Sequence, residues 1–552
     1  MWRSLSLATT GAAQVCSELD LVHHAHVEQH ASGKNRVDYM FRRASQMALH
    51  EYPCYAIAPL FWWRIIGGVL NWRGLGGKSF CLWRDAGTGF GTTPLLAGRK
   101  LTRYHLQDMG ASVVPTWKKY VNGFLAGELS ALTRYYDQLV QWQPREDDSG
   151  MLLAAMDSPL KYTVGKDEPL PDLMDEKRLR TAVLVNGAFN HDFDIQGLLI
   201  QLKSKLSRTS RLVVLLYNPY LRWLYYLANR LRIRKGELPS TFVTRVDLQN
   251  IAKVAGFEIV RQRLAVHCPW RLFGLGDVIN RVLPLVPLIR WFSLTSIVVL
   301  RPLIASSRPG ISCIIPARNE RGNIENALKR FPDLGCETEI IFVEGHSSDG
   351  TWEEIQRVAS LYGQRFRIQT LQQTGKGKAD AVRLGFANAT EHLLVILDAD
   401  LSMPPEMLRR FYDAYCQGYG DFINGSRLVY PMEGTAMRFL NRIGNIFFAK
   451  ALSSILDVSI GDSLCGTKLL TRHDYQRMMQ WRHDFGDFDP FGDFELLFPA
   501  AVLGLGIVDI PVRYLARTYG ETNIHRFRHG MLLLKMTWIG LIRIKMGVRR
   551  KG

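Results

Sequence analysis

Three short apolar segments in the second half of the sequence are followed by acidic residues, and this repeated pattern constrains the fold more than any other feature. The segments are residues 311–315, 339–343 and 393–397, and the acids stand at 320, 344, 398 and 400. Short apolar runs of this kind predict buried strands, and a helical pattern comes after each of them. Strands that alternate with helices predict a parallel sheet covered by helices, which is an α/β domain.

The first half of the sequence has the same organisation. Apolar segments at residues 78–83, 181–185, 212–217 and 296–300 alternate with helical patterns and predict a second parallel sheet. Residues 301–310 (RPLIASSRPG) are rich in Pro, Ser and Gly, which indicates a linker, and 552 residues are enough for more than one domain. The predicted parts are an irregular segment at 1–59, α/β domains at 60–300 and 311–529, the linker at 301–310 between them, and a C-terminal helix at 530–552.

The composition narrows the partners and the compartment. The sequence has 69 Lys and Arg against 51 Asp and Glu, and the net charge of +18 favours an anionic partner such as a phosphorylated small molecule, nucleic acid or an acidic membrane. Nucleic acid is not expected, because the cations form no stripe interleaved with aromatic residues. The eight cysteines form no CxxC pair, which argues against structural zinc and favours a reducing cytoplasm. The sequence has no run of about 18 apolar residues, which is the length that a membrane-spanning helix needs.

A glycine-rich segment in the first half indicates a cofactor loop. Gly87, Gly89 and Gly91 come after Asp85, and Asp108 follows 17 residues beyond the last of them. Glycines at alternate positions let the backbone approach a ligand where side chains would collide. An acid at the position of Asp108 accepts both ribose hydroxyls of a nucleoside-type cofactor in doubly wound sheets.

With this loop, residues 60–300 resemble the Rossmann-like methyltransferases that use S-adenosylmethionine, whose first motif is an acid followed by GxGxG. The segments that fall in the order of that family's later elements are Asp157 and residues 186–192, 211–219 and 248–257. The resemblance implies a Rossmann-like fold and S-adenosylmethionine as cofactor, bound by Asp85, the three glycines and Asp108.

The first half also departs from that family. Trp83 and Arg84 stand where the family has small apolar strand residues, and no acceptor-binding signature follows. Two alternatives therefore stay open for the first domain: a bifunctional enzyme that also methylates a glycan, and a non-catalytic scaffold.

The strand ends of the second half indicate a site for a nucleotide sugar. The carboxyl ends of parallel strands meet at one edge of a sheet, where ligands bind, and acids there can accept hydrogen bonds from a nucleobase or ribose. Asp398 and Asp400 follow the third strand, and carboxylates at this spacing can bind Mg²⁺ or Mn²⁺ that bridges to a diphosphate. Lys376 and Lys378 lie in a glycine-containing loop that suits phosphate binding.

These motifs make residues 310–545 resemble the family-2 glycosyltransferases of GT-A fold, nearest to the dolichyl-phosphate mannose synthase and polyprenyl-phosphate glycosyltransferase branch. The matching motifs are PARNE at 316–320, SSDGT at 347–351, GKGKADAVRLGF at 375–386, LDADLSMPPE at 397–406, GSR at 425–427 and RTYGETN at 517–523. The resemblance implies a metal-dependent, inverting transferase that moves a sugar from a nucleoside-diphosphate sugar to a polyprenyl-phosphate or envelope-glycan acceptor. It also implies a metal at Asp398 and Asp400, a phosphate contact at Arg427, and a nucleotide-sugar site formed by Pro316, Ala317, Arg318, Glu320, Glu344, Asp349, Lys378 and Asp398.

Two positions depart from the glycosyltransferase pattern. Gly345 follows Glu344 where the family often has a second acid, and Ser402 stands where the lipid-phosphate branch commonly has Gln as a further metal ligand. The sequence therefore leaves open the identity of the nucleotide and the details of metal coordination.

Asp462 and Asp493 complete, with Arg427, the predicted catalytic set. In an inverting displacement a carboxylate takes the proton of the acceptor hydroxyl as its oxygen attacks the anomeric carbon, and either acid is a candidate for this base. A lipid phosphate is already ionised and needs no base, and the two acids would then orient Arg or Lys side chains. The sequence leaves both alternatives open.

The C-terminal residues 530–551 are apolar on most faces and include six Lys and Arg. Such a helix can lie in the headgroup region of an anionic membrane, or it can pack across the catalytic domain. We expect a cytoplasmic protein with a peripheral contact to the inner face of the cell membrane.

Overall fold

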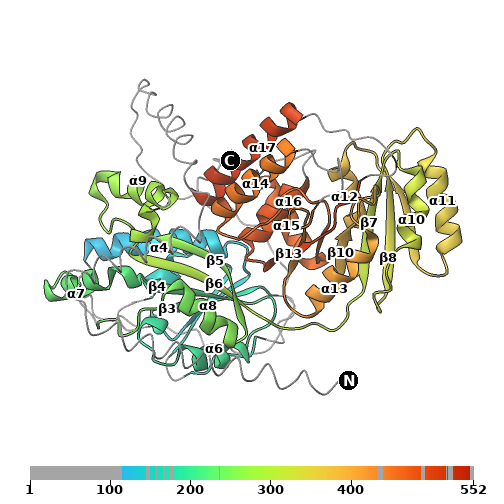
Figure 1. The fold of residues 1–552 in the computed structure, drawn as a ribbon. Coiled ribbons are helices and arrows are strands. Elements are labelled where there is room, and N and C mark those ends of the chain that lie inside the picture. Colours follow the sequence, from blue (N-terminus) through green and yellow to red (C-terminus); the bar gives the residue numbers. More distant parts are fainter. Residues whose placement is uncertain are drawn as a thin grey trace, which may run out of the picture. The chain divides into compact units, whose positions relative to one another are not determined.

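The computed structural model describes residues 115–546 except 145–149, 157, 166–167, 174–178, 235–236, 287, 432–438, 486–491, 517–518 and 520–525. This part of the chain contains a six-stranded sheet followed by a seven-stranded sheet, each with helices packed against it (Figure 1). The predicted segment 1–59, the predicted strand 78–83, the glycine-rich loop, Asp108 and Asp157 lie outside the described residues.

The first sheet has the strand order β2-β1-β3-β4-β6-β5. Its strands are β1 (Gln138–Trp142), β2 (Leu160–Val164), β3 (Thr181–Asn186), β4 (Arg211–Tyr217), β5 (Phe257–Ala265) and β6 (Thr295–Pro302). The helices of this part are α4 (Thr116–Thr133), α5 (Met151–Ala155), α6 (Ile195–Lys203), α7 (Arg222–Arg230), α8 (Arg245–Val254) and α9 (Leu275–Val282). The strands predicted at 181–185, 212–217 and 296–300 are confirmed.

The prediction that this sheet is wholly parallel is wrong for one strand. β6 runs antiparallel to both β4 and β5. Residues 266–294 join β5 to β6 and stay at the edge of the sheet where β5 ends. The chain therefore does not cross back to the opposite edge before β6 begins, and β6 runs antiparallel to its neighbours. The linker also starts later than predicted, because Arg301 and Pro302 still belong to β6.

The second sheet has the strand order β13-β11-β12-β10-β7-β8-β9. Its strands are β7 (Ile311–Ala317), β8 (Thr338–Glu344), β9 (Arg367–Gln372), β10 (Leu393–Ile396), β11 (Phe422–Ser426), β12 (Lys468–Thr471) and β13 (Ile507–Pro511). The three strands predicted here are confirmed as β7, β8 and β10. This sheet is also mixed, because β12 runs antiparallel to β10 and β11.

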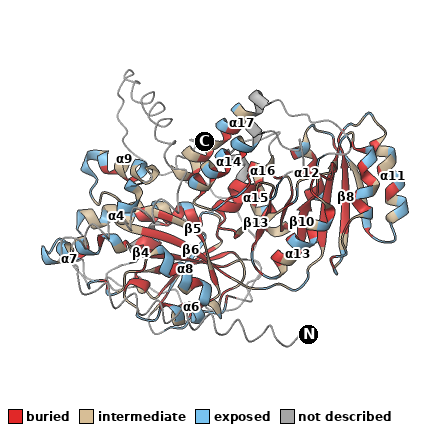
Figure 2. Ribbon diagram, viewed as in Figure 1, coloured by how far each residue is buried: buried red, intermediate tan, exposed pale blue. Residues whose placement is uncertain are grey.

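Helices cover both faces of the second sheet. They are α10 (Ile324–Lys329), α11 (Thr351–Tyr362), α12 (Lys378–Asn388), α13 (Leu408–Cys416), α14 (Phe439–Leu456), α15 (Arg472–Phe485), α16 (Gly492–Val502) and α17 (Arg526–Gly540), which continues as a π-helix over Leu541–Lys545. Most strand residues are buried while the outer helix faces are exposed (Figure 2). Separate apolar clusters pack on the two faces of each sheet, as expected for helix-covered sheets.

Buried arginines lie at one edge of the first sheet. Arg180 directly precedes β3, Arg211 opens β4 and Arg301 lies near the end of the antiparallel β6, so all three are at the amino-terminal edge of the parallel strands. Their side chains are 0–1% exposed and form ion pairs with Asp474 and Asp421, which belong to the part of the chain that forms the second sheet. The opposite, carboxyl-terminal edge carries the segments that follow β3, β4 and β5.

The C-terminal helix packs on one side and is exposed on the other. Leu533, Met536 and Ile544 lie in an apolar cluster together with residues of α14 and α16, whereas Leu534 and Trp538 are exposed. The sequence left two alternatives for this helix, which were a position at a membrane surface and packing on the domain of the second sheet. One face of the helix packs on that domain. Among the described residues, every helix is too short or too polar to cross a bilayer.

Candidate functional site

The carboxyl ends of β7, β8 and β10 meet at one edge of the second sheet, because these parallel strands are neighbours or next neighbours. Each strand is followed by a non-glycine residue in the left-handed region: Asn319 (φ 56°), His346 (φ 57°) and Leu401 (φ 52°). Such conformations cost about 1–3 kcal/mol each and cluster at functional sites. The strain thus marks the edge where the sequence predicted ligand binding.

The predicted nucleoside residues come together at the ends of β7 and β8. Pro316 and Ala317 lie opposite Val343 and Glu344 in the strand register. The Glu344 carboxylate is buried and accepts a hydrogen bond from the Ser347 backbone amide at 2.5 Å. This hydrogen bond fixes the turn after β8. Arg318 follows β7 and is exposed.

Hydrogen bonds at Glu320 and Asp349 join the two loops. The Glu320 backbone amide donates to the Thr351 hydroxyl at 3.0 Å, and the buried Glu320 carboxylate accepts from the Asn323 side-chain amide at 2.7 Å. Asp349 accepts hydrogen bonds from the Thr351 hydroxyl at 2.5 Å and from the Tyr519 hydroxyl at 3.2 Å. Burial would raise the pKa of Asp349, but these donors stabilise its charged form and keep the pKa below the ordinary value. The loops therefore hold the Asp349 carboxylate beside the strand ends in its charged form.

The two acids that follow β10 differ in their surroundings. The Asp398 carboxylate contacts the Lys378 ammonium at the start of α12. Burial would lower the pKa of Lys378, but the carboxylates of Asp398 and Asp493 raise it above the ordinary value. Asp400 is buried and accepts hydrogen bonds from the backbone amide and the hydroxyl of Ser402, at 3.0 and 2.7 Å.

Gly466 closes this part of the site. A Cβ atom at that position would collide with the Asp398 carboxylate and the Lys378 ammonium. The absence of a side chain at Gly466 therefore allows Asp398 and Lys378 to lie directly against the backbone.

The donor set of Asp398 and Asp400 fits a hard divalent cation. Carboxylate oxygens are the ligands that Mg²⁺ and Mn²⁺ prefer. No group of three or more His, Cys, Asp or Glu side chains able to hold a metal lies within the described residues. Mg²⁺ is commonly held by one or two carboxylates, with water and substrate phosphate as its other ligands, so two acids are sufficient for a nucleotide-bound ion.

Asp462 is tied to Arg427. The Arg427 guanidinium donates from Nε to Asp462 Oδ2 at 2.7 Å and from Nη2 to Oδ1 at 2.9 Å, and the Asp462 side chain is 0% exposed. Burial would raise the pKa of Asp462, but Arg427 lowers it below the ordinary value. The buried pairing with Arg427 favours the orienting alternative for Asp462, and its role as a base stays a prediction.

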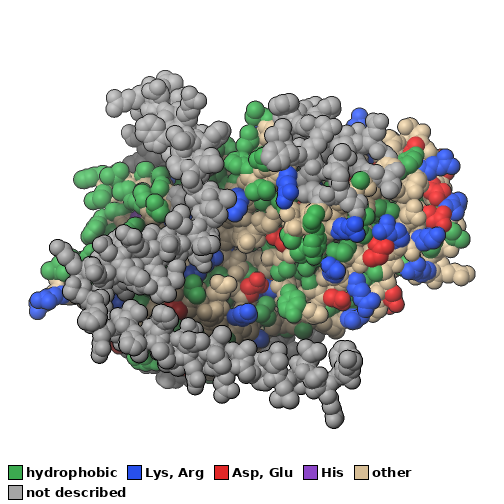
Figure 3. Space-filling model, viewed as in Figure 1, with side chains coloured by type: hydrophobic (Ala, Val, Ile, Leu, Met, Phe, Trp, Pro, Cys, Tyr) green, Lys and Arg blue, Asp and Glu red, His purple; other side chains and the backbone are tan. Residues whose placement is uncertain are grey.

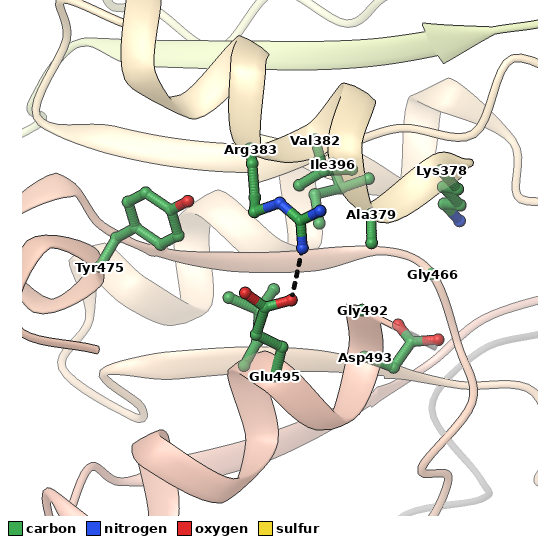
Figure 4. A pocket seen from close by; sticks show the side chains of 11 residues that line it. Lys378, Ala379, Val382, Arg383, Ile396, Gly466, Tyr475, Gly492, Asp493 and Glu495 are labelled. Atoms are coloured by element: carbon green, nitrogen blue, oxygen red, sulfur yellow. Dashed lines mark hydrogen bonds and ion pairs between the residues drawn. The ribbon is translucent and has the colours of Figure 1, made fainter. Parts of the chain in front are cut away.

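Asp493 is tied to Lys468. Lys468 is fully buried and its Nζ lies 2.6 Å from Asp493 Oδ1. Asp493 lines an open hollow between α12 and α16 with Lys378, Gly466 and Gly492 (Figure 4). Both predicted acids therefore form carboxylate–cation pairs, and Asp493 alone of the two lies in this hollow.

Sequence reasoning missed three residues at this site, Lys468, Arg383 and Glu495. Lys468 opens the short strand β12, and the Arg383–Glu495 ion pair at 3.0 Å lines the same hollow (Figure 4). A signal for Lys468 was present in the sequence, because it stands six residues after Asp462, which was already a candidate. Arg383 and Glu495 lie 112 residues apart, and nothing in the sequence pairs them.

The S-adenosylmethionine prediction cannot be placed on this structure. Asp85, Gly87, Gly89, Gly91 and Asp108 all lie outside the described residues. Within the described part, the edge strand pair β1 and β2 is parallel, and β1 runs into Gln143 and Pro144 without a glycine-rich loop directly after it.

Comparison with protein families finds a match that includes most strands of the second sheet. Residues 312–479 match the family described as Glycosyl transferase family 2. A dolichol-phosphate mannosyltransferase of Pyrococcus furiosus is 29% identical over 222 residues, which are 39% of this chain and 59% of that protein. An undecaprenyl-phosphate 4-deoxy-4-formamido-L-arabinose transferase of Klebsiella pneumoniae is 26% identical over 220 residues, 39% of this chain and 62% of that protein.

Among solved structures, a glucosyl-3-phosphoglycerate synthase of Mycobacterium tuberculosis aligns with a TM-score of 0.31 and 16% identity over 44% of this chain and 82% of that one. The chain thus spans about 60% of the length of the two transferases named above. Residues 312–479 thus match the model of Glycosyl transferase family 2, and proteins similar to part of this chain carry the names of transferases.

Proposed function

We propose that this chain transfers a sugar, with inversion, from a nucleoside-diphosphate sugar to a phosphate group on a polyprenyl chain. Two relatives of the family 2 domain carry the names of transferases for dolichol phosphate and undecaprenyl phosphate, which supports this class of acceptor. An envelope glycan with a hydroxyl acceptor is the second candidate. The peripheral contact with an anionic membrane belongs to the same proposal, because a polyprenyl phosphate resides in a bilayer.

One observation carries the choice of a phosphate acceptor. Transfer to a hydroxyl group needs a carboxylate free to take a proton. The two predicted candidates, Asp462 and Asp493, are instead ion-paired with Arg427 and Lys468. Such pairs orient cations, and an oriented guanidinium suits a phosphate that is already ionised.

The donor side of the reaction follows from the strand-end residues. Glu320, Glu344 and Asp349 shape the loops that would contact the nucleoside, and Lys378 supplies a cation beside Asp398 for the diphosphate. Asp398 and Asp400 would hold Mg²⁺ or Mn²⁺, and the ion would neutralise the charge on the departing nucleoside diphosphate. Arg427, fixed by Asp462, would meet a phosphate.

The acceptor class can be tested with matched substrates. The purified chain is incubated with a panel of sugar nucleotides, and the donor that is consumed is then offered a polyprenyl phosphate and the polyprenyl alcohol of equal length. We expect turnover of the phosphate to exceed that of the alcohol at least ~100-fold, since a general base typically contributes 10²–10⁴-fold and the alcohol lacks one here. Equal rates with both acceptors would support the hydroxyl-acceptor candidate and overturn this choice.

We further propose that the first domain acts as a scaffold for the transferase domain. The buried arginines Arg180, Arg211 and Arg301 support this role, because they bind acids and backbone carbonyls in the second half of the chain. Isothermal titration of the full chain with S-adenosylmethionine tests the scaffold against the bifunctional alternative. We expect no heat of binding at millimolar ligand, and a saturable heat signal would instead favour a cofactor-binding domain.

A further inference from the structure

Two segments at the carboxyl edge of the first sheet expose many large apolar side chains. We call residues 219–234, which include α7, and residues 269–292, which include α9, the apolar rim. Its exposed apolar residues are Tyr220, Trp223, Tyr226, Leu227, Leu231, Ile233, Trp270, Leu272, Phe273, Leu275, Val278, Val282, Leu288, Ile289, Trp291 and Phe292. Figure 3 shows hydrophobic side chains gathered over α9. A surface of this kind exceeds the scattered apolar residues of an ordinary protein surface and marks an interaction site.

The two segments of the rim meet where the second ends and the first begins. The Asn218 side-chain amide donates to the backbone carbonyls of Trp291 at 2.7 Å and Ser293 at 2.6 Å. The Tyr225 hydroxyl in α7 donates to the carbonyl of Leu294. Hydrogen bonds thus fix the end of the second segment against the start of the first.

The polar side of α9 is bound to the body of the domain. The Tyr120 hydroxyl donates to Asp277 at 2.9 Å, and the buried Asn280 accepts from the His267 and Cys268 amides at 2.7 and 2.8 Å. An amphipathic helix in a globular domain normally buries its apolar face. In α9 the buried residues are Gly276 and Asn280, while Leu275, Val278 and Val282 are exposed.

The turn before α9 holds its apolar side chains outward in strained backbone. Leu272 and Phe273 have φ values of 45° and 55°, and their exposed fractions are 50% and 112%. The amides of Gly274 and Gly276 both donate to the carbonyl of Arg271, which fixes the turn. Backbone strain of this kind persists where the surrounding structure imposes it, and it points to a role for the side chains that it presents.

The charge of the rim favours one type of partner. Its two segments contain seven arginines, four in 219–234 and three in 269–292, and Asp277 is their single acidic residue. Tryptophan and tyrosine prefer the interface between lipid and water, and arginines attract anionic headgroups. A second copy of the chain is a poor partner, because a two-fold contact would bring this positive surface against itself.

We propose that the apolar rim docks on the surface of an anionic lipid bilayer. Trp270 and Phe273 enter the boundary between headgroups and acyl chains, and the arginines lie at the level of the lipid phosphates. This surface is separate from the C-terminal helix in sequence and belongs to the first sheet. The inference does not depend on the acceptor, although a lipid-linked acceptor would lie in the same bilayer.

Sedimentation of the full chain with vesicles tests the proposal. Vesicles of phosphatidylcholine alone are compared with vesicles that contain phosphatidylglycerol as well, and we expect strong partition only onto the second type. The double variant W270S/F273S is expected to lower the partition coefficient at least ~10-fold, since each side chain loses apolar burial. The exposed Leu361 on α11 provides the control, and L361S should bind like the unaltered chain.

The arginines are tested in the same assay. Each of Arg271→Gln and Arg281→Gln should weaken partition onto anionic vesicles roughly 5-fold, because a cation near such a surface contributes about 1 kcal/mol. Arg409→Gln on α13, whose side chain is 61% exposed, is the matched control and should have no effect. All these side chains are exposed, so unchanged thermal unfolding will show that the variants fold.

Three results would overturn the docking proposal: equal partition of W270S/F273S and the unaltered chain, no binding to anionic vesicles, or a dimer that the double variant dissociates without any vesicle binding. Sugar transfer to a short-chain, water-soluble polyprenyl phosphate separates this proposal from the proposed function. The rim variants should keep that activity. Loss of transfer in a chain that still binds vesicles would count against the function and leave the docking surface intact.

Discussion

The substitution Asp400→Asn is expected to abolish sugar transfer while the protein stays folded. Asn keeps the shape of the side chain, and its Oδ1 can still accept the hydrogen bonds from Ser402. The substitution removes the negative charge, and the site would then bind a divalent cation more weakly. A bound cation would stabilise the departing diphosphate by several kcal/mol. We therefore expect kcat/KM to fall about 10³-fold or more.

The measurement is turnover of the sugar nucleotide in a Mn²⁺ titration, together with the thermal midpoint of unfolding. Chelation of divalent ions should inactivate the unaltered chain to a similar degree, and added Mn²⁺ should restore that chain but not the variant. Asp413→Asn on α13, which removes a partly exposed acid 3.8 Å from Arg409, serves as the control. Full turnover of Asp400→Asn with Mn²⁺ present would refute the metal assignment.

The sequence predicted the strand-end acids because their placement needs only local rules. An apolar run marks a strand, and the carboxyl ends of neighbouring parallel strands must lie at one edge of the sheet. This is why Glu344, Asp398 and Asp400 could be placed at the site before the fold was known. The same rules could not find β12, because a run of four residues that starts with a lysine has no distinctive periodicity.

The role of Asp462 could not be settled in this way. Whether a carboxylate takes a proton or orients a cation depends on the side chain that lies beside it, and Arg427 is 35 residues away in the sequence. The two residues meet because β11 ends beside the loop that precedes β12, an antiparallel pairing that the sequence did not predict. Left-handed backbone at Asn319, His346 and Leu401 likewise follows from tertiary packing.

The burial of the arginines between the two halves also could not be predicted from the sequence. Arg211 stands directly before an apolar strand and Arg301 directly after one, and a charged residue in that position is normally solvated. Both are buried in the fold, because their guanidinium groups donate hydrogen bonds to Asp421 and to several backbone carbonyls. A buried charge is tolerated only with such partners, and partners distant in sequence leave no local trace.

The substitution Asp421→Asn should destabilise the protein more than any other single change at this contact. The Asp421 carboxylate accepts hydrogen bonds from Arg211 at 2.7 Å, Arg208 at 3.2 Å and Arg301 at 3.4 Å, and its side chain is 6% exposed. Removal of its charge leaves three cations close together with low access to water. Breaking a buried ion pair in this manner costs about 3–5 kcal/mol of unfolding free energy.

Denaturant unfolding of the full chain measures this loss, and acidification gives an independent check. Burial would raise the pKa of Asp421, but Arg301, Arg211 and Arg208 hold it well below its ordinary value of 3.8. A depressed pKa means that the carboxylate stabilises the fold above about pH 4 and that this contribution is lost as the pH falls further. The stability difference between the unaltered chain and Asp421→Asn should therefore be constant near neutral pH and shrink in acid.

Asp413→Asn again provides the control, since an exposed ion pair contributes less than about 1 kcal/mol. If Asp421→Asn unfolds at the same denaturant concentration as Asp413→Asn, the arginines do not join the two halves of the chain, and the scaffold role of the first domain loses its physical basis. If it unfolds earlier but the metal-dependent transfer of the folded fraction is unchanged, the contact supports stability alone. Because Asp421 directly precedes β11, and Arg427 directly follows that strand, we expect the phosphate-binding side of the site to weaken as well, which a higher KM for the acceptor would reveal.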